Sequence, residues 1–151
     1  MKDRRDLLPV MLKMYRIAER AGIELRFVPH DIPIPCLAGL GYGSKFELFT
    51  DNNTGQRFGR VTVAYHVDQA TPEDLFWSFG HELGHAMQWK RGWPIMDGAL
   101  DPLRQAREVD AWDYAKMLAD LTDWPTNARF ERTRAISLST YGVVERAPVY
   151  A

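Results

Sequence analysis

Residues 71–74, Thr-Pro-Glu-Asp, constrain the fold of this chain more than any other segment, because they combine three features that start a helix. Thr71 is a preferred N-cap residue, Pro72 suits the first helical position, and Asp74 follows the cap by three residues, as in a capping box. The pattern predicts a helix from Pro72 to Lys90. The middle of this helix carries the sequence His-Glu-Leu-Gly-His at positions 81–85.

The two histidines of this segment have the spacing of metal ligands. Residues four apart on a helix project from the same face, so His81 and His85 can bind one metal ion while Glu82 stands beside it. The same face carries Asp74, Ser78 and Gln88, whereas the opposite face carries Phe76, Phe79, Leu83, Ala86 and Met87. This division predicts a helix with a buried apolar back and a metal-binding front. Two surface histidines, or two core histidines bonded to the backbone, are the alternatives.

Asp74 has two interpretations. It orients a ligand histidine as a hydrogen-bond acceptor, or it caps the helix and interacts favourably with the helix dipole.

A third ligand is needed, because a catalytic zinc ion normally has three protein ligands and an open position for water. No histidine follows His85, which leaves the carboxylates Glu108, Asp110 and Asp113. They lie on a helix predicted from Asp101 to Leu121. On it, Glu108 shares a face with Ala111, Trp112, Ala115, Leu118 and Ala119, whereas the two aspartates lie on the polar side. Glu108 is therefore the predicted ligand, with a solvated helix carboxylate as the alternative. The small alanines predict a close approach to Gly84.

The remaining segments predict an α+β fold. The expected elements are a helix over Val10–Ala21, strands over Ile23–Val28, Phe46–Thr50 and Gly59–Val67, and a last helix over Pro125–Leu138. Residues 29–43 are rich in proline and glycine and predict mostly loop or edge structure. We expect one domain over residues 1–151, with a small, mostly antiparallel sheet. The arginines from Arg129 to Arg134 predict a solvated helix face.

Composition excludes several classes of function. With 19 basic and 20 acidic residues among 151, the formal charge of −1 removes the attraction to phosphates that a nucleic-acid binder needs. Cys36 is the only cysteine, so no intramolecular disulfide is possible. No apolar run is long enough to span a membrane, and the charged N-terminal segment is unlike a signal peptide. We expect a cytoplasmic protein that contacts neither nucleic acid nor membrane.

The pattern HELGH at 81–85 followed by ExxAxxxA at 108–115 resembles the minimal gluzincin domain of the ImmA/IrrE family, over residues 59–119. The resemblance implies a Zn2+ site formed by His81, His85 and Glu108, with Glu82 as general base. It also implies a cytoplasmic zinc protease that acts on a transcriptional repressor. The Met-Pro pair that is common in the family is replaced here by MLADLTDWP at 117–125, and the C-terminal third has no counterpart.

The expected reaction is hydrolysis of a peptide bond in a protein substrate, with Glu82 transferring a proton from water to the leaving amine. The strand Gly59–Val67 would bind an extended peptide if it lay at the sheet edge, and its His66 is either a substrate contact or a strand-end histidine without a role. His30 is either a weaker candidate for a metal or oxyanion role or a loop histidine, and Tyr42 and Tyr141 receive no role. The alternative function is a zinc-stabilised binding protein, such as an inhibitor or anti-defence protein of a mobile element. Glu82 favours the enzyme, because a structural site has no use for a base.

Overall fold

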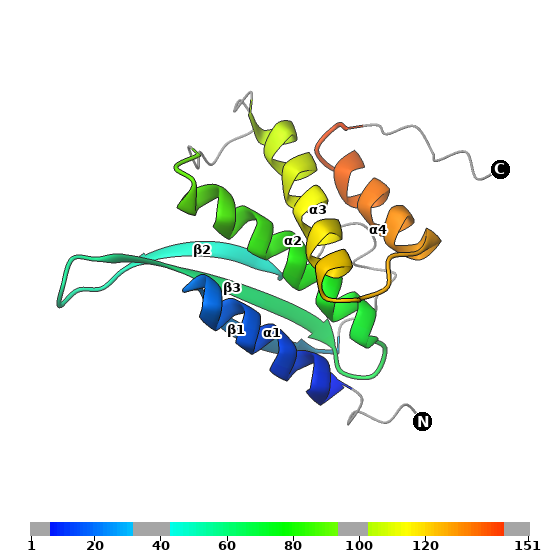
Figure 1. The fold of residues 1–151 in the computed structure, drawn as a ribbon, viewed down its shortest axis with the longest axis horizontal. Coiled ribbons are helices and arrows are strands. Elements are labelled where there is room, and N and C mark those ends of the chain that lie inside the picture. The colour runs from blue at the N-terminus through cyan, green and yellow to red at the C-terminus, as the bar shows by residue number, and fades with distance from the viewer. Residues whose placement is uncertain (1–6, 32–42, 94–102, 144–151) are drawn as a thin grey trace.

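The computed structural model describes residues 7–31, 43–93 and 103–143 (Figure 1). Within this part the chain forms four helices and one three-stranded sheet, which confirms the predicted α+β class. The elements, in chain order, are α1 (Leu7–Ala21), β1 (Glu24–His30), β2 (Lys45–Thr50), β3 (Arg57–His66), α2 (Pro72–Lys90), α3 (Arg104–Leu121) and α4 (Ala128–Ser139). None of the described helices is long and apolar enough to cross a membrane.

The sheet has the order β1-β3-β2 and is mixed. β2 and β3 form the predicted antiparallel pair, but β1 runs parallel to β3, so the prediction of a mostly antiparallel sheet is wrong for β1. A parallel pair requires a crossover connection, which no local turn encodes. β3 is the central strand, so it has no free edge for a peptide. The outer strands of this sheet are β1, which is parallel to β3, and β2, which is antiparallel to it.

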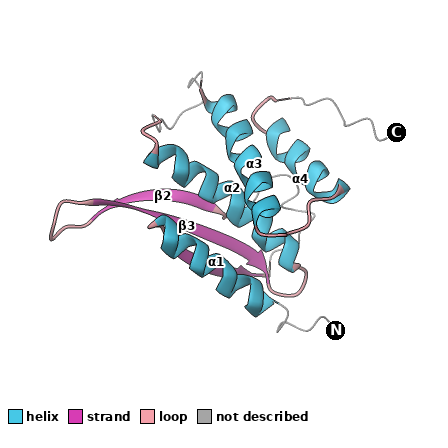
Figure 2. Cartoon of the chain, viewed as in Figure 1, coloured by secondary structure: helices cyan, strands magenta, loops and turns pink. Residues whose placement is uncertain are grey.

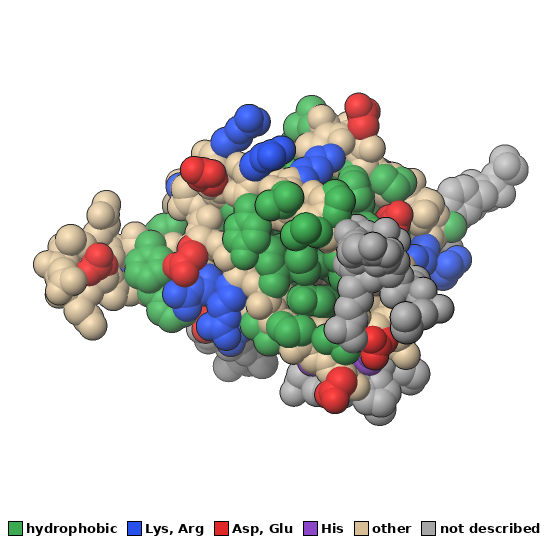
Figure 3. Space-filling view, turned by 90° about the horizontal axis from the view of Figure 1, so that it is seen from below, with side chains coloured by type: hydrophobic (Ala, Val, Ile, Leu, Met, Phe, Trp, Pro, Cys, Tyr) green, Lys and Arg blue, Asp and Glu red, His purple; other side chains and the backbone are tan. Residues whose placement is uncertain are grey.

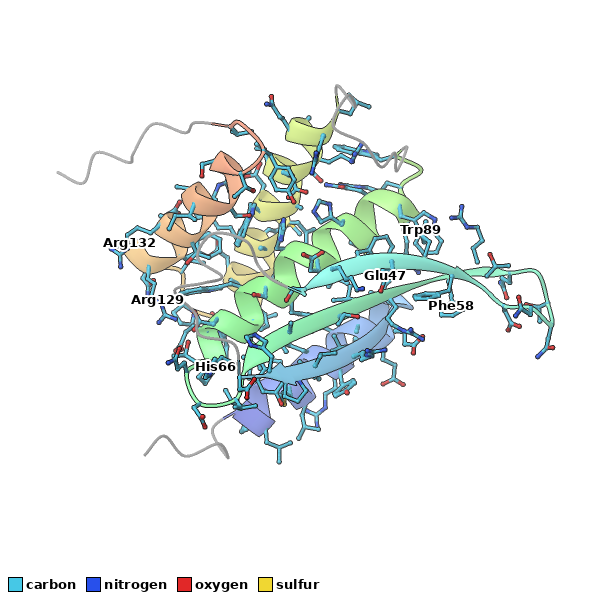
Figure 4. The ribbon with its side chains drawn as sticks, turned by 180° about the vertical axis from the view of Figure 1, so that it is seen from behind. Glu47, Phe58, His66, Trp89, Arg129 and Arg132 are labelled. Atoms are coloured by element: carbon cyan, nitrogen blue, oxygen red, sulfur yellow. The ribbon has the colours of Figure 1, made fainter. Side chains whose placement is uncertain are left out.

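The main core lies between the sheet and two helices. Figure 4, seen from behind, shows the strands in front of both α1 and α2, and Lys13 of α1 lies over the ring of Phe76 of α2. The two helices therefore pack side by side on one face of the sheet. Their shared core includes Met14, Val61 and Val63, all completely or almost completely buried.

Two further helices extend the structure beyond α2. In Figure 2, α3 lies against α2 on the side away from α1, and α4 lies beside α3. A second hydrophobic cluster joins these three helices and contains Trp77, Trp112, Ala115, Phe130 and Leu138. The last helix begins three residues later than predicted, because Asn127 caps it through Arg129 N and Phe130 N.

The start of α2 forms as the sequence predicts. Thr71 Oγ1 accepts a hydrogen bond from Asp74 N, and Asp74 Oδ2 accepts one from Thr71 N, each at 3.2 Å. Arg129 of α4 donates to both side chains and ties α4 to this end of α2. Of the two interpretations of Asp74, the structure supports the helix cap.

Close packing between α2 and α3 sets the depth of the site. A Cβ atom placed on Gly84 would lie 2.8 Å from both Cα and the carbonyl oxygen of Ala111. Gly80 similarly faces Ala115, at 3.1 Å. The prediction that small residues bring these helices together is confirmed. The start predicted for α3 at residues 101 and 102 lies outside the described residues.

The outward-facing side of α1 is apolar. Figure 3, seen from below, shows hydrophobic side chains gathered there, and Leu8, Leu12 and Tyr15 are each about half exposed. This face lies on the opposite side of the main core from α4.

Candidate metal centre

The structure brings His81, His85 and Glu108 together between α2 and α3. His81 Nε2 lies 2.8 Å from Glu108 Oε2, and His85 Nε2 lies 3.1 Å from Glu108 Oε1. His81 and Glu108 are buried, and His85 is partly exposed. One ligand atom from each residue lies within 4.8 Å of the others. The group is therefore close enough to hold a metal ion.

The donor set fits zinc in type and in size. Two imidazole nitrogens and a carboxylate oxygen form one of the usual ligand sets of a catalytic zinc ion. Bonds of about 2.0–2.1 Å in a tetrahedron separate the ligand atoms by roughly 3.3 Å, so only small side-chain movements are needed.

The hydrogen bonds around Gln88 determine which nitrogen of His85 is free. Gln88 is almost completely buried, and its Nε2 donates to Arg107 O at 2.7 Å and to Asp110 Oδ2 at 2.9 Å. Its Oε1 therefore faces His85 Nδ1, at 3.1 Å, and accepts a hydrogen bond from it. His85 Nε2 is therefore the ring nitrogen available to a metal ion, and it lies 3.1 Å from a carboxylate oxygen of Glu108.

Gln88 is a residue whose part in the site the sequence analysis missed. Its position on the histidine face of the helix was predicted, but no role was assigned to it. The available clue was its spacing of three residues from His85, which places it on the same helix face.

His81 is held by its neighbours on both sides. Trp112 of α3 stacks on the imidazole with ring centroids 4.5 Å apart and an interplanar angle of 15°. The indole Nε1 of Trp112 donates to Ser137 Oγ of α4. Glu82 Oε1 lies 3.4 Å from His81 Nδ1, so the Glu82 carboxylate stands beside the metal-binding group without belonging to it.

Charge interactions at the site shift two pKa values in opposite directions. Burial lowers the pKa of His81, but the charge of Glu82 and the hydrogen bond to Glu108 outweigh it and raise the value to about 9. Burial raises the pKa of Glu108, yet the hydrogen bonds from His81 and His85 lower it to about 2. Without a metal, His81 and Glu108 thus form a buried ion pair at neutral pH.

A cavity of about 200 Å³ opens beside His81 and Glu82. Its other lining residues are Ser44, Ser78, Trp112, Thr133, Ile136, Ser137, Thr140 and Tyr141. Burial and the charges of Glu108 and Glu82 raise the pKa of Tyr141. No role could be predicted for Tyr141 from the sequence, because its place depends on how α4 packs.

Several other candidate residues lie away from this group. His66 lies at the end of β3 (Figure 4), where its Nδ1 accepts hydrogen bonds from Asp68 N and Gln69 N. Its ring contacts that of His30, with centroids 5.7 Å apart. These contacts support the interpretation of His66 as a strand-end histidine. Tyr42 and Cys36 lie outside the described residues.

Neither aspartate of α3 joins the metal-binding group. Asp110 accepts hydrogen bonds from Gln88 and Arg91, and Asp113 pairs with Arg134 at 2.7 Å. Arg134 is buried, and Arg129 pairs with Asp74. The predicted solvated arginine face is therefore wrong at these two positions, because α4 packs against two helices that supply carboxylates.

Comparison with known proteins gives no further assignment. No family model matches the chain, and searches of curated proteins and of solved structures return no match. Inference about function therefore depends on the motif residues and on the geometry of the site.

Proposed function

We propose that this chain is a zinc-dependent endopeptidase that resembles the gluzincins of the ImmA/IrrE family. The observation that carries the proposal is the position of Glu82. Its carboxylate lies beside His81, lines the cavity and stays outside the group of three ligands. A carboxylate that lies beside the metal ligands without being one of them suits a general base, whereas a purely structural metal site needs no base.

Each residue of the site has its own role in peptide hydrolysis. His81, His85 and Glu108 would hold the zinc ion, which when bound lowers the pKa of water and polarises the scissile carbonyl. Glu82 takes a proton from the attacking water and delivers it to the leaving amine. The hydroxyl of Tyr141, on the cavity wall, is placed to donate a hydrogen bond to the carbonyl oxygen as negative charge develops there.

The substrate in this proposal is an extended segment of a protein. β2 pairs with β3 along one edge, and within the described residues no strand pairs with its other edge. Ser44, which directly precedes β2, lines the cavity. An extended peptide that added to β2 would therefore lead to the metal centre. By the family resemblance, that protein is a cytoplasmic transcriptional regulator.

The replacement Glu82→Gln tests the enzymatic role. It preserves the size of the side chain but removes the base, so zinc content and stability should remain while turnover falls by a factor on the order of 10² or more. The measurement compares protein fragments by mass spectrometry after expression of the wild type and the variant in the native host. Fragments found only with the wild type would support the proposal.

Two controls separate loss of the base from loss of the metal. Glu108→Gln should release zinc, whereas Asp113→Asn, an equivalent change on the exposed side of the same helix, should retain it. If the wild type and Glu82→Gln give identical fragments and phenotypes, the endopeptidase fails. The zinc-stabilised binding protein would then be the better account.

A further inference from the structure

We infer that the inner face of α4 selects substrates with an uncharged, hydrogen-bonding side chain beside the scissile bond, a carboxamide such as that of asparagine above all. The inference rests on the proposed function, since it concerns the cavity next to the metal centre. It concerns the C-terminal third of the chain, to which the motif residues assign no role.

The wall that α4 contributes is rich in hydroxyl groups. Thr133, Ser137 and Thr140 follow a spacing of four and three residues, which puts them on one face of the helix, and all three line the cavity. Ser78 of α2 and Ser44 add hydroxyls from other directions. The lining also has an apolar part, which includes Trp112 and Ile136, and a purely apolar side chain would match that part alone.

The hydroxyl groups of this wall already take part in hydrogen bonds within the protein. Thr133 Oγ1 donates to Arg129 O at 2.9 Å, and Thr140 Oγ1 donates to Ser137 O at 2.7 Å. Because each hydroxyl has one proton, both threonines can offer only lone pairs to a ligand. Ser137 Oγ instead accepts a hydrogen bond from Trp112 Nε1, and its own proton is left for an acceptor.

This pattern matches a carboxamide. An N–H group of the carboxamide can donate to one of the two threonine oxygens, and its carbonyl can accept from Ser137. An aliphatic side chain of similar size satisfies none of these groups. The cavity volume of about 200 Å³ is below the roughly 300–1,000 Å³ of sites for drug-sized molecules, so it suits one side chain with the reacting peptide group.

Charge excludes acidic side chains from the cavity. Its lining includes Glu82 but neither lysine nor arginine among the described residues. The arginines of α4 are directed elsewhere: Arg134 pairs with Asp113, Arg129 pairs with Asp74, and Arg132 extends outward from the helix in Figure 4. A carboxylate would meet Glu82 and the threonine lone pairs, and neither lysine nor arginine of the described lining would balance its charge.

The test measures the binding of zinc-chelating ligands, so that it does not depend on turnover. Dipeptide hydroxamates with asparagine, leucine or aspartate next to the chelating group are titrated into the zinc-loaded full chain by calorimetry. We expect the asparagine compound to bind about tenfold more tightly than the leucine compound, as one to two net hydrogen bonds would give, and the aspartate compound to bind most weakly.

The double variant Thr133→Val/Thr140→Val keeps the shape of the wall but removes both acceptors, so it should reverse the order of asparagine and leucine. Ser139→Ala removes a hydroxyl from α4 outside the cavity lining and should leave the order unchanged. An unchanged order in the double variant, or tightest binding of leucine or aspartate by the wild type, would overturn the inference. If the expected order appears but Glu82→Gln leaves the fragment pattern unaltered, the preference of the cavity for a carboxamide holds, while the endopeptidase is rejected and with it the assignment of that carboxamide to a cleaved substrate.

Discussion

At the scale of single residues, Gln88 links the metal-binding group to the rest of α3. Its amide is fixed by two acceptors, Arg107 O and Asp110 Oδ2, and in turn fixes the proton of His85 on Nδ1. The residue acts through His85 and is therefore a positioning residue. Sequence periodicity could place Gln88 on the correct face, but its partners belong to another helix, and no local pattern specifies them.

Replacement of Gln88 by leucine should weaken zinc binding by about 10–100-fold, the usual effect of removing a partner that orients a ligand histidine. The physical reason is that His85 Nδ1 loses its acceptor, so neither the tautomer nor the ring orientation is fixed. Competition with a fluorescent zinc chelator measures the change. Gln56→Leu, at an exposed turn position, is the control and should bind zinc like the wild type. Equal affinities for Gln88→Leu and the wild type would contradict this role.

The ion pair of His81 and Glu108 should make the stability of the metal-free protein depend on pH. The pKa of His81 is raised from 6.5 to about 9, so its contribution is complete below pH 6.5 and is lost as the pH rises through about 9. The pKa of Glu108 is lowered from 4.5 to about 2, so its contribution is complete above pH 4.5 and is lost as the pH falls through about 2. The stabilisation should therefore be greatest between pH 4.5 and 6.5.

Zinc affinity should instead rise as the pH increases towards about 9, because the ion competes with the proton that His81 carries in the metal-free protein. One displaced proton gives a rise in affinity of about tenfold per pH unit up to about pH 9. Urea denaturation of the chelator-treated protein measures the first effect, and zinc titration at several pH values measures the second. A flat affinity profile between pH 6.5 and 9 would show that His81 is not protonated in the metal-free protein.

At the scale of elements, the segments with the strongest local signals were the most predictable. The bounds of α2 match the prediction at both ends, and its start is encoded by a capping box within four consecutive residues. The β2–β3 pair also followed from adjacent strands and a turn. The parallel pairing of β1 did not, because its partner is reached only after another strand. Pro29, in the segment predicted as loop or edge structure, lies in β1, an edge strand that tolerates a proline.

The contact between α2 and α3 should make Gly84 intolerant of even a methyl group. Alanine favours a helix by about 1 kcal/mol over glycine, but its Cβ would lie 2.8 Å from the backbone of Ala111. Overpacking of this kind typically costs about 1–3 kcal/mol, so Gly84→Ala should lower the free energy of unfolding and displace Glu108. Urea denaturation and zinc content measure both effects. Gly80→Ala, with contacts of 3.1 Å, should cost less. Greater stability of Gly84→Ala than of the wild type would rule out this close approach.

At the scale of the whole molecule, the candidate site depends on two separate packing contacts, one between α2 and α3 and one between α4 and these helices. The metal-binding group lies between α2 and α3, whereas Tyr141 and the hydroxyl wall of the cavity depend on α4. α4 is held to the other helices by the cluster around Phe130 and by the ion pairs of Arg129 and Arg134. The motif residues could therefore be predicted from sequence, while the shape of the cavity could not, since it depends on contacts between distant segments.

A substitution that weakens the packing of α4 should therefore change ligand selection without changing metal binding. Phe130 is completely buried against Trp77 and Trp112, with ring centroids 5.5 and 5.8 Å away. Phe130→Leu keeps the position apolar and should cost about 1–2 kcal/mol of unfolding free energy, less than the roughly 3–5 kcal/mol of truncation to alanine.

Zinc affinity should stay within a few-fold of the wild type, because all three ligands belong to α2 and α3. The preference for the asparagine hydroxamate should fall, because the threonine wall is no longer held at a fixed distance from His81. Chelator competition and calorimetry on the same protein distinguish the two effects. An equal loss of zinc affinity and selectivity would mean that α4 supports the metal centre itself.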